Sequence, residues 1–260
     1  MVSISSDMLQ AWVSGLLWPL TRILALIAVA PIFNHTALPA RFKLVLGVFI
    51  TLAIMPSLPP VPDIDMLSIQ GAGVLVQQII IGVSIGFIMR ILFAAISMAG
   101  HISAMSMGLG FASFYDPQTQ GQTTSVSQIF MIIAMLFFLS IDGHLMMIMA
   151  ISESFVTMPV SLEITSGINF LTIVTWGGSI FSAGLHMALP VVTALLITNL
   201  ALGILSRTAP QLNLFGIGFP ITISIGLVVI ALTLPRLSVP LERLISDGFG
   251  TITSITAPAR

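Results

Sequence analysis

Residues 72–99 read AGVLVQQIIIGVSIGFIMRILFAAISMA, and this stretch decides the fold class. A membrane-spanning helix needs about 20 mostly apolar residues, because each adds about 1.5 Å across a hydrocarbon core of about 30 Å. The stretch is long enough, and Arg90 is its only charged residue. It lacks the period-2 alternation of a barrel strand, so it predicts a transmembrane helix.

Apolar stretches of this kind recur along the chain and predict an all-α integral membrane protein with about six helical segments. Two lengths are unusual. The second stretch is short for a span, and the fifth is too long for one straight helix, so Gly177–Gly178, Gly184 or Pro190 could kink or break it. The six stretches are Trp12–Phe33, Phe42–Leu58, Ala72–Ala99, Ile129–Ile151, Ile168–Leu205 and Leu212–Leu234.

The composition supports a membrane protein and excludes other classes. Apolar residues make up 57% of the chain and charged residues 7%, with a mean hydropathy of +1.12. Soluble proteins carry about 25% charged residues. A net charge of -1 offers no basic patch for nucleic acid, and the absence of cysteine excludes disulfides and thiolate metal sites. The first stretch follows Asp7 rather than a basic segment, so it predicts an uncleaved span rather than a removed signal peptide.

The charges between the stretches predict an orientation. Arg41, Lys43 and Arg207 lie in connections that fall inside if the N-terminus is outside, as the positive-inside bias expects. The C-terminal tail then lies outside, although it carries arginines and so departs from that bias. Residues Val239–Thr253 share an apolar face and predict a short helix at the membrane interface.

Catalytic motifs are weak. The four histidines lie at least about forty residues apart without an HExxH pattern, so no zinc protease site is predicted. Gly82-Val83-Ser84-Ile85-Gly86 fits the G-x-S-x-G pattern of serine hydrolases, and His144 or His186 could serve as its base. The two glycines equally fit a close packing face between helices, which is the favoured interpretation because the strand–turn–helix context of the hydrolase motif is missing.

Three charges lie inside apolar stretches, where each costs at least about 2.5 kcal/mol at the middle of a bilayer. They are Arg22, Arg90 and Asp142. We predict structural roles for all three, in ion pairs, as snorkelled side chains or at an interface. Asp142 begins the sequence Asp142-Gly143-His144, which predicts a turn between two half-segments; a proton relay through Asp142 and His144 is the alternative.

The connection Ala99–Gln128 is the most informative part of the chain. It joins two apolar stretches, yet it contains MSMGLGFASFYDP at residues 105–117. Glycines let the backbone bend, and methionine and phenylalanine supply adaptable apolar bulk. A long apolar loop at membrane depth must be buried in protein or line a cavity. Packing of irregular helices alone would also account for the methionines.

Five ordered blocks spread over nearly the whole chain make it resemble the FliR/SctT family of type III secretion export-gate membrane proteins, on the flagellar side of that family. The blocks are LPARFKL at 38–44, MGLGFASFYDP at 107–117, DGHL at 142–145, NLALGILSRTAPQLN at 199–213 and GFP at 218–220.

The resemblance implies a non-enzymatic subunit of a helical, hetero-oligomeric gate in the bacterial inner membrane, at the flagellar basal body. The partners it implies are FliP and FliQ in the gate and FlhB and FlhA at its cytoplasmic side, with unfolded flagellar proteins as the exported substrate. It implies no cofactor or metal. Several helices would be tilted or broken and packed on partners rather than on lipid.

The resemblance also implies roles for parts of the chain. Within one export-gate domain, 1–260, it gives N-terminal helices 1–99, a plug loop 100–128, central helices 129–205, a C-terminal hairpin 168–234 and a tail 235–260. Arg207 and Pro210 would form the cytoplasmic turn of the hairpin, in contact with FlhB. The plug residues it implies are Met105, Met107, Gly108, Gly110, Phe111, Phe114, Tyr115, Asp116 and Pro117.

Two alternatives of other classes remain at this point. A stand-alone secondary transporter or channel would use Arg90, Asp142 and His144 in a path at the membrane midplane, but no repeated halves are visible. An intramembrane serine protease would use Ser84.

Overall fold

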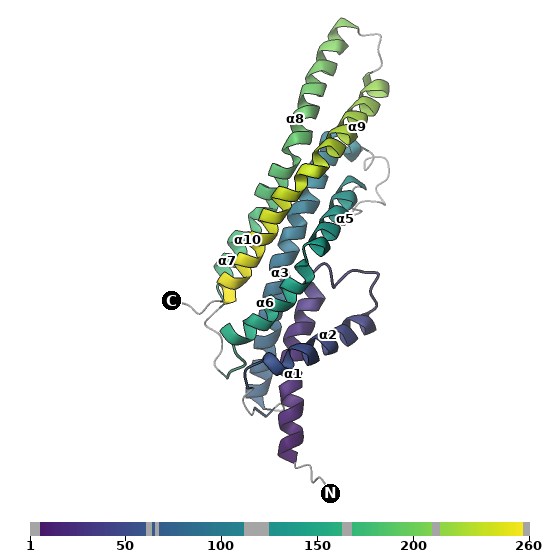
Figure 1. Ribbon diagram of the computed structural model, residues 1–260. Coiled ribbons are helices and arrows are strands. Elements are labelled where there is room, and N and C mark those ends of the chain that lie inside the picture. The colour runs from purple at the N-terminus through teal and green to yellow at the C-terminus, as the bar shows by residue number, and fades with distance from the viewer. Residues whose placement is uncertain are drawn as a thin grey trace. The chain divides into compact units, whose positions relative to one another are not determined.

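A computed structural model describes residues 6–60, 64–65, 68–111, 125–162, 168–209 and 214–256. These residues form helices and connections, and no strand occurs among them (Figure 1). The predicted all-α class is therefore confirmed.

The elements follow one another as a series of long helices with short 3-10 turns. The first half contains α1 (Ser6–Val29), α2 (Ala40–Ile54), η1 (Met55–Ser57), α3 (Ile69–Ser106) and η2 (Leu109–Phe111). The second half contains α5 (Ser125–Ser140), α6 (Gly143–Thr157), α7 (Phe170–Gly177), α8 (Ser179–Thr208), α9 (Leu214–Thr233), η4 (Leu234–Leu237) and α10 (Ser238–Thr256).

Each of the six predicted apolar stretches corresponds to one or more of these helices. Within the described ranges, four helical runs are long and apolar enough to cross a membrane, namely Ala40–Ser57, Ile69–Ser106, Phe170–Thr208 and Gly216–Thr256. The pair α5–α6 makes a fifth if it counts as one span. The first stretch lies in α1, which is apolar over Gly15–Val29. The chain is thus a multi-pass helical membrane protein.

The predicted turn at Asp142-Gly143-His144 is confirmed. Helices α5 and α6 meet there at an angle of 67°. Asp142 has φ 56°, in the left-handed region that residues other than glycine seldom adopt. Its amide donates to the carbonyl of Leu139, and its own carbonyl accepts from Leu145, so the turn closes both helix ends.

The long fifth stretch is interrupted only briefly. Gly178 separates α7 from α8 and keeps helical dihedral angles (φ −61°, ψ −24°), and α8 then continues through Gly184 and Pro190. At the C-terminus, the predicted helix Val239–Thr253 forms the greater part of α10. Because η4 joins α9 to α10 in one apolar run, the interfacial placement of α10 stays a prediction.

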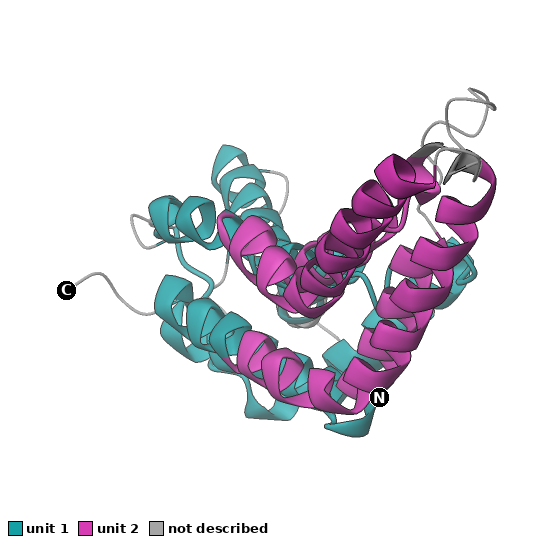
Figure 2. Ribbon diagram, turned by 90° about the horizontal axis from the view of Figure 1, so that it is seen from above, with its two compact units in different colours: residues 1–91, 139–177, 247–260 teal, residues 92–138, 178–246 magenta. Residues whose placement is uncertain are grey.

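The described chain divides into two compact units, which Figure 2 colours separately. The first comprises residues 1–91, 139–177 and 247–260. Its core is formed by α1, the first part of α3 and α6, with Trp18, Ile85 and Phe155 among its buried side chains. The indole Nε1 of Trp176 in α7 donates to the carbonyl of Ile88 at 3.2 Å.

The second unit comprises residues 92–138 and 178–246. Phe93 of α3 and Phe138 of α5 meet edge to face in its core, with ring centroids 5.8 Å apart. Helices α8 and α9 run side by side within this unit as a hairpin (Figure 1). Helix α3 contributes to both units, because its residues lie on either side of the division after Ile91.

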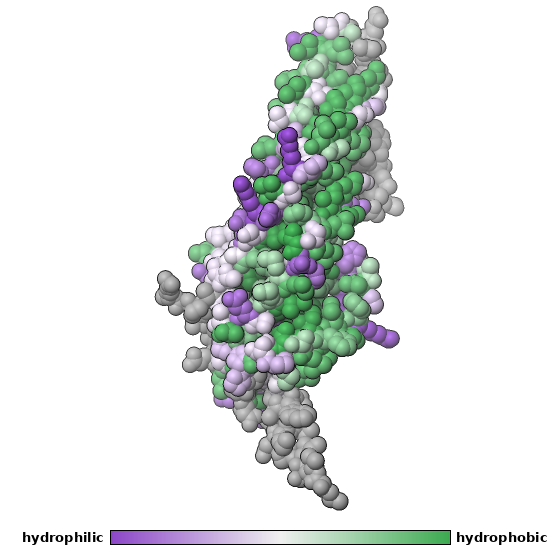
Figure 3. Space-filling view, viewed as in Figure 1, coloured by the Kyte–Doolittle hydropathy of each residue, from purple (hydrophilic) through white to green (hydrophobic). Residues whose placement is uncertain are grey.

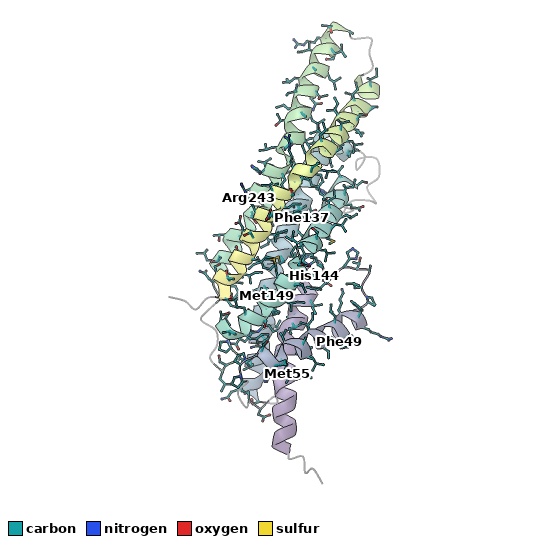
Figure 4. All side chains as sticks on the ribbon, in the orientation of Figure 1. Phe49, Met55, Phe137, His144, Met149 and Arg243 are labelled. Carbon is teal, nitrogen blue, oxygen red and sulfur yellow. The ribbon has the colours of Figure 1, made fainter. Side chains whose placement is uncertain are left out.

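Burial differs strongly among the apolar helices. In the most apolar part of α3, 67% of the residues are buried, against 17% in the α7–α8 run. Hydrophobic residues make up most of the visible face of α8 and α9 in Figure 3, with a few polar residues among them. Phe49 of α2 and Met149 of α6, labelled in Figure 4, are also exposed. These surfaces need lipid or other protein to cover them.

Candidate functional site

The predicted plug loop, 100–128, starts inside α3, which continues to Ser106 and includes Met105. A tight turn follows and ends the helix. The amide of Met107 donates to the carbonyl of Ser103, and the amide of Gly108 donates to the carbonyl of Met105, both at 3.0 Å. Gly108 has φ 86°, which only glycine adopts without strain. The chain therefore leaves the helix axis at Gly108 and enters η2.

Helix α9 packs against this turn inside the second unit. The hydroxyl of Thr222 donates to the carbonyl of Met107 at 3.0 Å. A Cβ placed on Gly226 would lie 2.5 Å from Cγ of Met107, so the methionine side chain occupies the space that a larger residue would need. A Cβ on Gly108 would lie 2.8 Å from the ring of Phe219.

The residues predicted for the plug differ in their surroundings. Met105 is 68% exposed, whereas Met107 is fully buried. A Cβ on Gly110 would meet no atom within 4 Å. Phe111 ends η2. The last four predicted plug residues, Phe114, Tyr115, Asp116 and Pro117, lie outside the described residues, and so does Pro210 of the predicted hairpin turn.

Arg22 forms a buried polar cluster in the first unit. Its Nε donates to Oε1 of Gln78 at 2.7 Å. Nη1 donates to the carbonyl and to Oγ of Ser154, at 2.8 and 3.1 Å, and Nη2 donates to the carbonyl of Met158 at 2.9 Å. The guanidinium also lies 4.0 Å from the ring centroid of Phe155.

The partners of Arg22 are neutral, and two of them are carbonyls at the C-terminal end of α6. That end carries the negative pole of the helix dipole, so it stabilises the cation in place of a carboxylate. The arrangement supports the predicted structural role of Arg22. Arg90 and Asp142, which share that prediction, are exposed on the described chain, and their structural roles stay predictions.

Arg207, predicted for the hairpin turn, is an exposed residue in the last turn of α8. A cation is favourable there because the helix dipole is negative at this end. The amide of Ala209 donates to the carbonyl of Leu205 and closes the helix.

The G-x-S-x-G pattern forms a packing face. A Cβ on Gly82 would overlap the carbonyl oxygen of Arg22, and a Cβ on Gly86 would lie 3.1 Å from the carbonyl oxygen of Leu26. The two glycines therefore let α3 approach the backbone of α1 closely, as the packing interpretation predicts. The described residues contain no group of three or more His, Asp or Glu that could hold a metal ion.

The family model described as bacterial export proteins, family 1, matches residues 13–248. The chain belongs to this family. It is 45% identical over 251 residues to the flagellar biosynthetic protein FliR of Pectobacterium carotovorum subsp. carotovorum, covering 96% of this chain and 95% of the relative. It is 40% identical over 255 residues to FliR of Escherichia coli (strain K12), with coverage of 98% and 97%. FliR of Bacillus subtilis (strain 168) is 28% identical over 244 residues.

Membership of the bacterial export proteins confirms the resemblance drawn from the five sequence blocks. The matches extend over nearly the whole chain, so its helices belong to the export protein rather than to an added membrane domain. The family and its relatives fit a component of bacterial flagellar export.

Sequence reasoning missed the residues on α9 that contact the start of the plug segment. Gly218-Phe219-Pro220 was one of the blocks of the resemblance, but no role was predicted for it. Thr222 and Gly226 carried no signal, because threonine and glycine are common in apolar helices. Gln78 and Ser154 around Arg22 were also missed, although Gln78 is a polar residue inside an apolar stretch and could have been singled out as a partner for a buried charge.

Proposed function

We propose that this chain is a subunit of the flagellar type III protein export gate, where it forms, with FliP and FliQ, the pore that passes unfolded flagellar subunits across the bacterial inner membrane. Residues Met105–Pro117 act as the plug of that pore. FlhB and FlhA associate at the cytoplasmic side, and the hairpin turn with Arg207 and Pro210 contacts FlhB.

The observation that carries the proposal is the way α3 ends. A long apolar helix stops at Ser106, between Met105 and Met107, and Gly108 turns the chain into a glycine- and phenylalanine-rich segment. The next helix that the structure describes, α5, begins at Ser125. Apolar, bendable residues at this place suit a seal that excludes ions and yields to a passing polypeptide. Family membership supports the same function.

The exposed surface of α8 supports assembly with other subunits. Leu196, Ile197, Leu200 and Ile204 are all strongly exposed. The amide side chain of Asn199 lies exposed among them. Lipid would cover the apolar residues but would leave the amide without hydrogen-bond partners, whereas a neighbouring protein subunit can cover both.

The proposal is tested by measuring ion leak through the membranes of cells that express the chain with a deletion in 108–114, with and without FliP and FliQ. We expect leak only when the partners are present and the complex still assembles. A deletion within 163–167, in another connection, serves as the control and should leave the membranes tight. Tight membranes around a verified, intact complex that carries the 108–114 deletion would contradict the plug assignment.

A further inference from the structure

One face of α9 meets the turn at the end of α3. Phe219, Thr222 and Gly226 are spaced three and four residues apart, so they lie on the same side of the helix. All three contact Met107 or Gly108, more than a hundred residues earlier in the chain. The proposed plug therefore starts where the end of α3 contacts α9 within the second unit.

The first contact is a buried hydrogen bond. The last carbonyls of a helix have no partner within that helix, and leaving one unpaired in apolar surroundings is costly. The hydroxyl of Thr222 supplies such a partner to the carbonyl of Met107, at 3.0 Å. The same hydroxyl lies 3.1 Å from the carbonyl of Phe219 in its own helix, so its one hydrogen is shared between the two.

The second contact is a socket for the methionine side chain. A Cβ on Gly226 would lie 2.5 Å from Cγ of Met107 and 2.9 Å from its Sδ and Cε. Met107 is fully buried, so it has little room to move aside. Only glycine at 226 leaves the space in which this side chain lies.

The third contact covers the turn itself. The Phe219 ring lies where a side chain on residue 108 would project, 2.8 Å from the Cβ position. Gly108 is thus held in a conformation that only glycine takes easily, against a ring that only glycine can approach. Two residues later, Gly110 has open space around its Cβ position.

We infer that Phe219, Thr222 and Gly226 form a fixed anchor for the plug. The anchor holds Met107 on α9, so the plug opens by bending of the chain after Gly108, where the Cβ position of Gly110 has open space, and Met107 stays in its socket. The inference rests on the proposed function for the role of 108–117. It adds that closure depends on residues of α9 that lie outside the plug.

The first test loosens the anchor and leaves the plug sequence intact. Thr222→Val keeps the shape of the side chain but removes its hydroxyl. Loss of one buried hydrogen bond raises the population of molecules in which the turn at Met107 has left α9 about five-fold. We expect ion leak to rise by about that factor in assembled complexes with FliP and FliQ. Gly226→Val fills the socket and should leak more.

Matched controls come from the same helix. Thr233→Val removes a hydroxyl that bonds only within α9, to the carbonyls of Val229 and Ile230. Gly218→Ala adds a methyl group where no atom lies within 4 Å. Both should stay as tight as the unmodified chain. If Gly226→Val fails to assemble, the isosteric Thr222→Val still decides the test.

The second test asks whether the anchor stays closed during export. The chain has no cysteine, so Met107→Cys with Gly226→Cys introduces a single possible pair. The Cβ atoms would lie within about 4 Å, because Cγ of Met107 is 2.5 Å from the Gly226 Cβ position, and this suits a disulfide. We expect the export rate of this variant to be the same with oxidant and with reductant.

The possible outcomes distinguish the anchor hypothesis from the plug hypothesis. Block of export by oxidant, relieved by reductant, would show that the contact must open and would overturn a fixed anchor. If the membranes stay tight with both Thr222→Val and Gly226→Val while the 108–114 deletion leaks, the anchor is refuted and the plug assignment stands. Tight membranes with the deletion itself would overturn the proposed function.

Discussion

Replacing Arg22 by methionine should destabilise the first unit more than any single change to an exposed charge. The guanidinium is fully buried and joins three elements, because it donates from α1 to Gln78 of α3 and to Ser154 and Met158 at the end of α6. Methionine has similar length and fills much of the same volume. The change therefore removes the hydrogen bonds with little loss of packing.

The magnitude follows from two opposing terms. Oε1 of Gln78 and the carbonyl of Met158 lose this donor, at about 1–3 kcal/mol each. The carbonyl and hydroxyl oxygens of Ser154 lose it too, but the carbonyl still accepts from the amide of Met158 and the hydroxyl still donates to Ile151, so each loses about 0.5–1.5 kcal/mol. The total loss is about 3–9 kcal/mol. Removing a buried charge also removes its desolvation penalty, which is several kcal/mol in proteins. Setting about 2–4 kcal/mol for that penalty against the middle of the first range, about 6 kcal/mol, leaves a net destabilisation of about 2–4 kcal/mol.

The measurement is the melting temperature of the purified complex in detergent. For a chain of this size the expected loss corresponds to a fall of roughly 5–15 °C. The melting temperature of Arg22→Lys should fall less, because an ammonium keeps the charge but cannot reach all four acceptor atoms in fixed geometry. Arg243→Met, at an exposed position of α10 (Figure 4), is the control and should change little. A melting temperature for Arg22→Met equal to that of the control would refute this account of the cluster.

Three further changes have outcomes that the same melting assay can check. Gly82→Val should cost at least about 1–3 kcal/mol, because its side chain would meet the backbone of α1, whereas Gly73→Val has open space and should be nearly neutral; equal effects would contradict the packing face. Gly100→Ala should cost about 1–3 kcal/mol, since its Cβ would lie 2.5 Å from Cα of Ser127, and an unchanged melt would show that α3 and α5 separate freely. Asp142→Val should be about 1–2 kcal/mol less stable than Asp142→Gly, because φ is 56° there, and equal melts would contradict the left-handed turn.

The helical architecture could be predicted because the bilayer leaves few choices. Each apolar stretch had to satisfy its own backbone hydrogen bonds, so its length and composition predicted a helix. The turn at Asp142-Gly143 was also predictable, since a short polar run with glycine interrupts an otherwise apolar stretch. The sequence left the depth of each helix open, because hydropathy responds equally to lipid and to apolar partners.

The contacts of the candidate site could not be predicted in the same way. The carbonyl of Met107 and the hydroxyl of Thr222 are 115 residues apart, and no periodicity in an apolar helix indicates which residue of another helix lies opposite. The partners of Arg22 show the same limit, because two of the acceptors are backbone carbonyls, which every residue has. Arg22 itself was conspicuous from the sequence, but its surroundings depend on the tertiary packing.

These two clusters together explain how such an apolar chain specifies one packing of its helices. Leucine and isoleucine gain little by facing another helix rather than lipid, so they hardly distinguish one register from another. A different helix register would leave a buried guanidinium without hydrogen-bond partners, or would force a methionine held against glycine to overlap a larger residue. Both outcomes cost much more free energy than exchanging one apolar contact for another. Arg22 therefore fixes α1 against α6, and Gly226 fixes α9 against the end of α3. The few polar and glycine positions determine the register, and the apolar majority remains free to meet lipid or partner subunits.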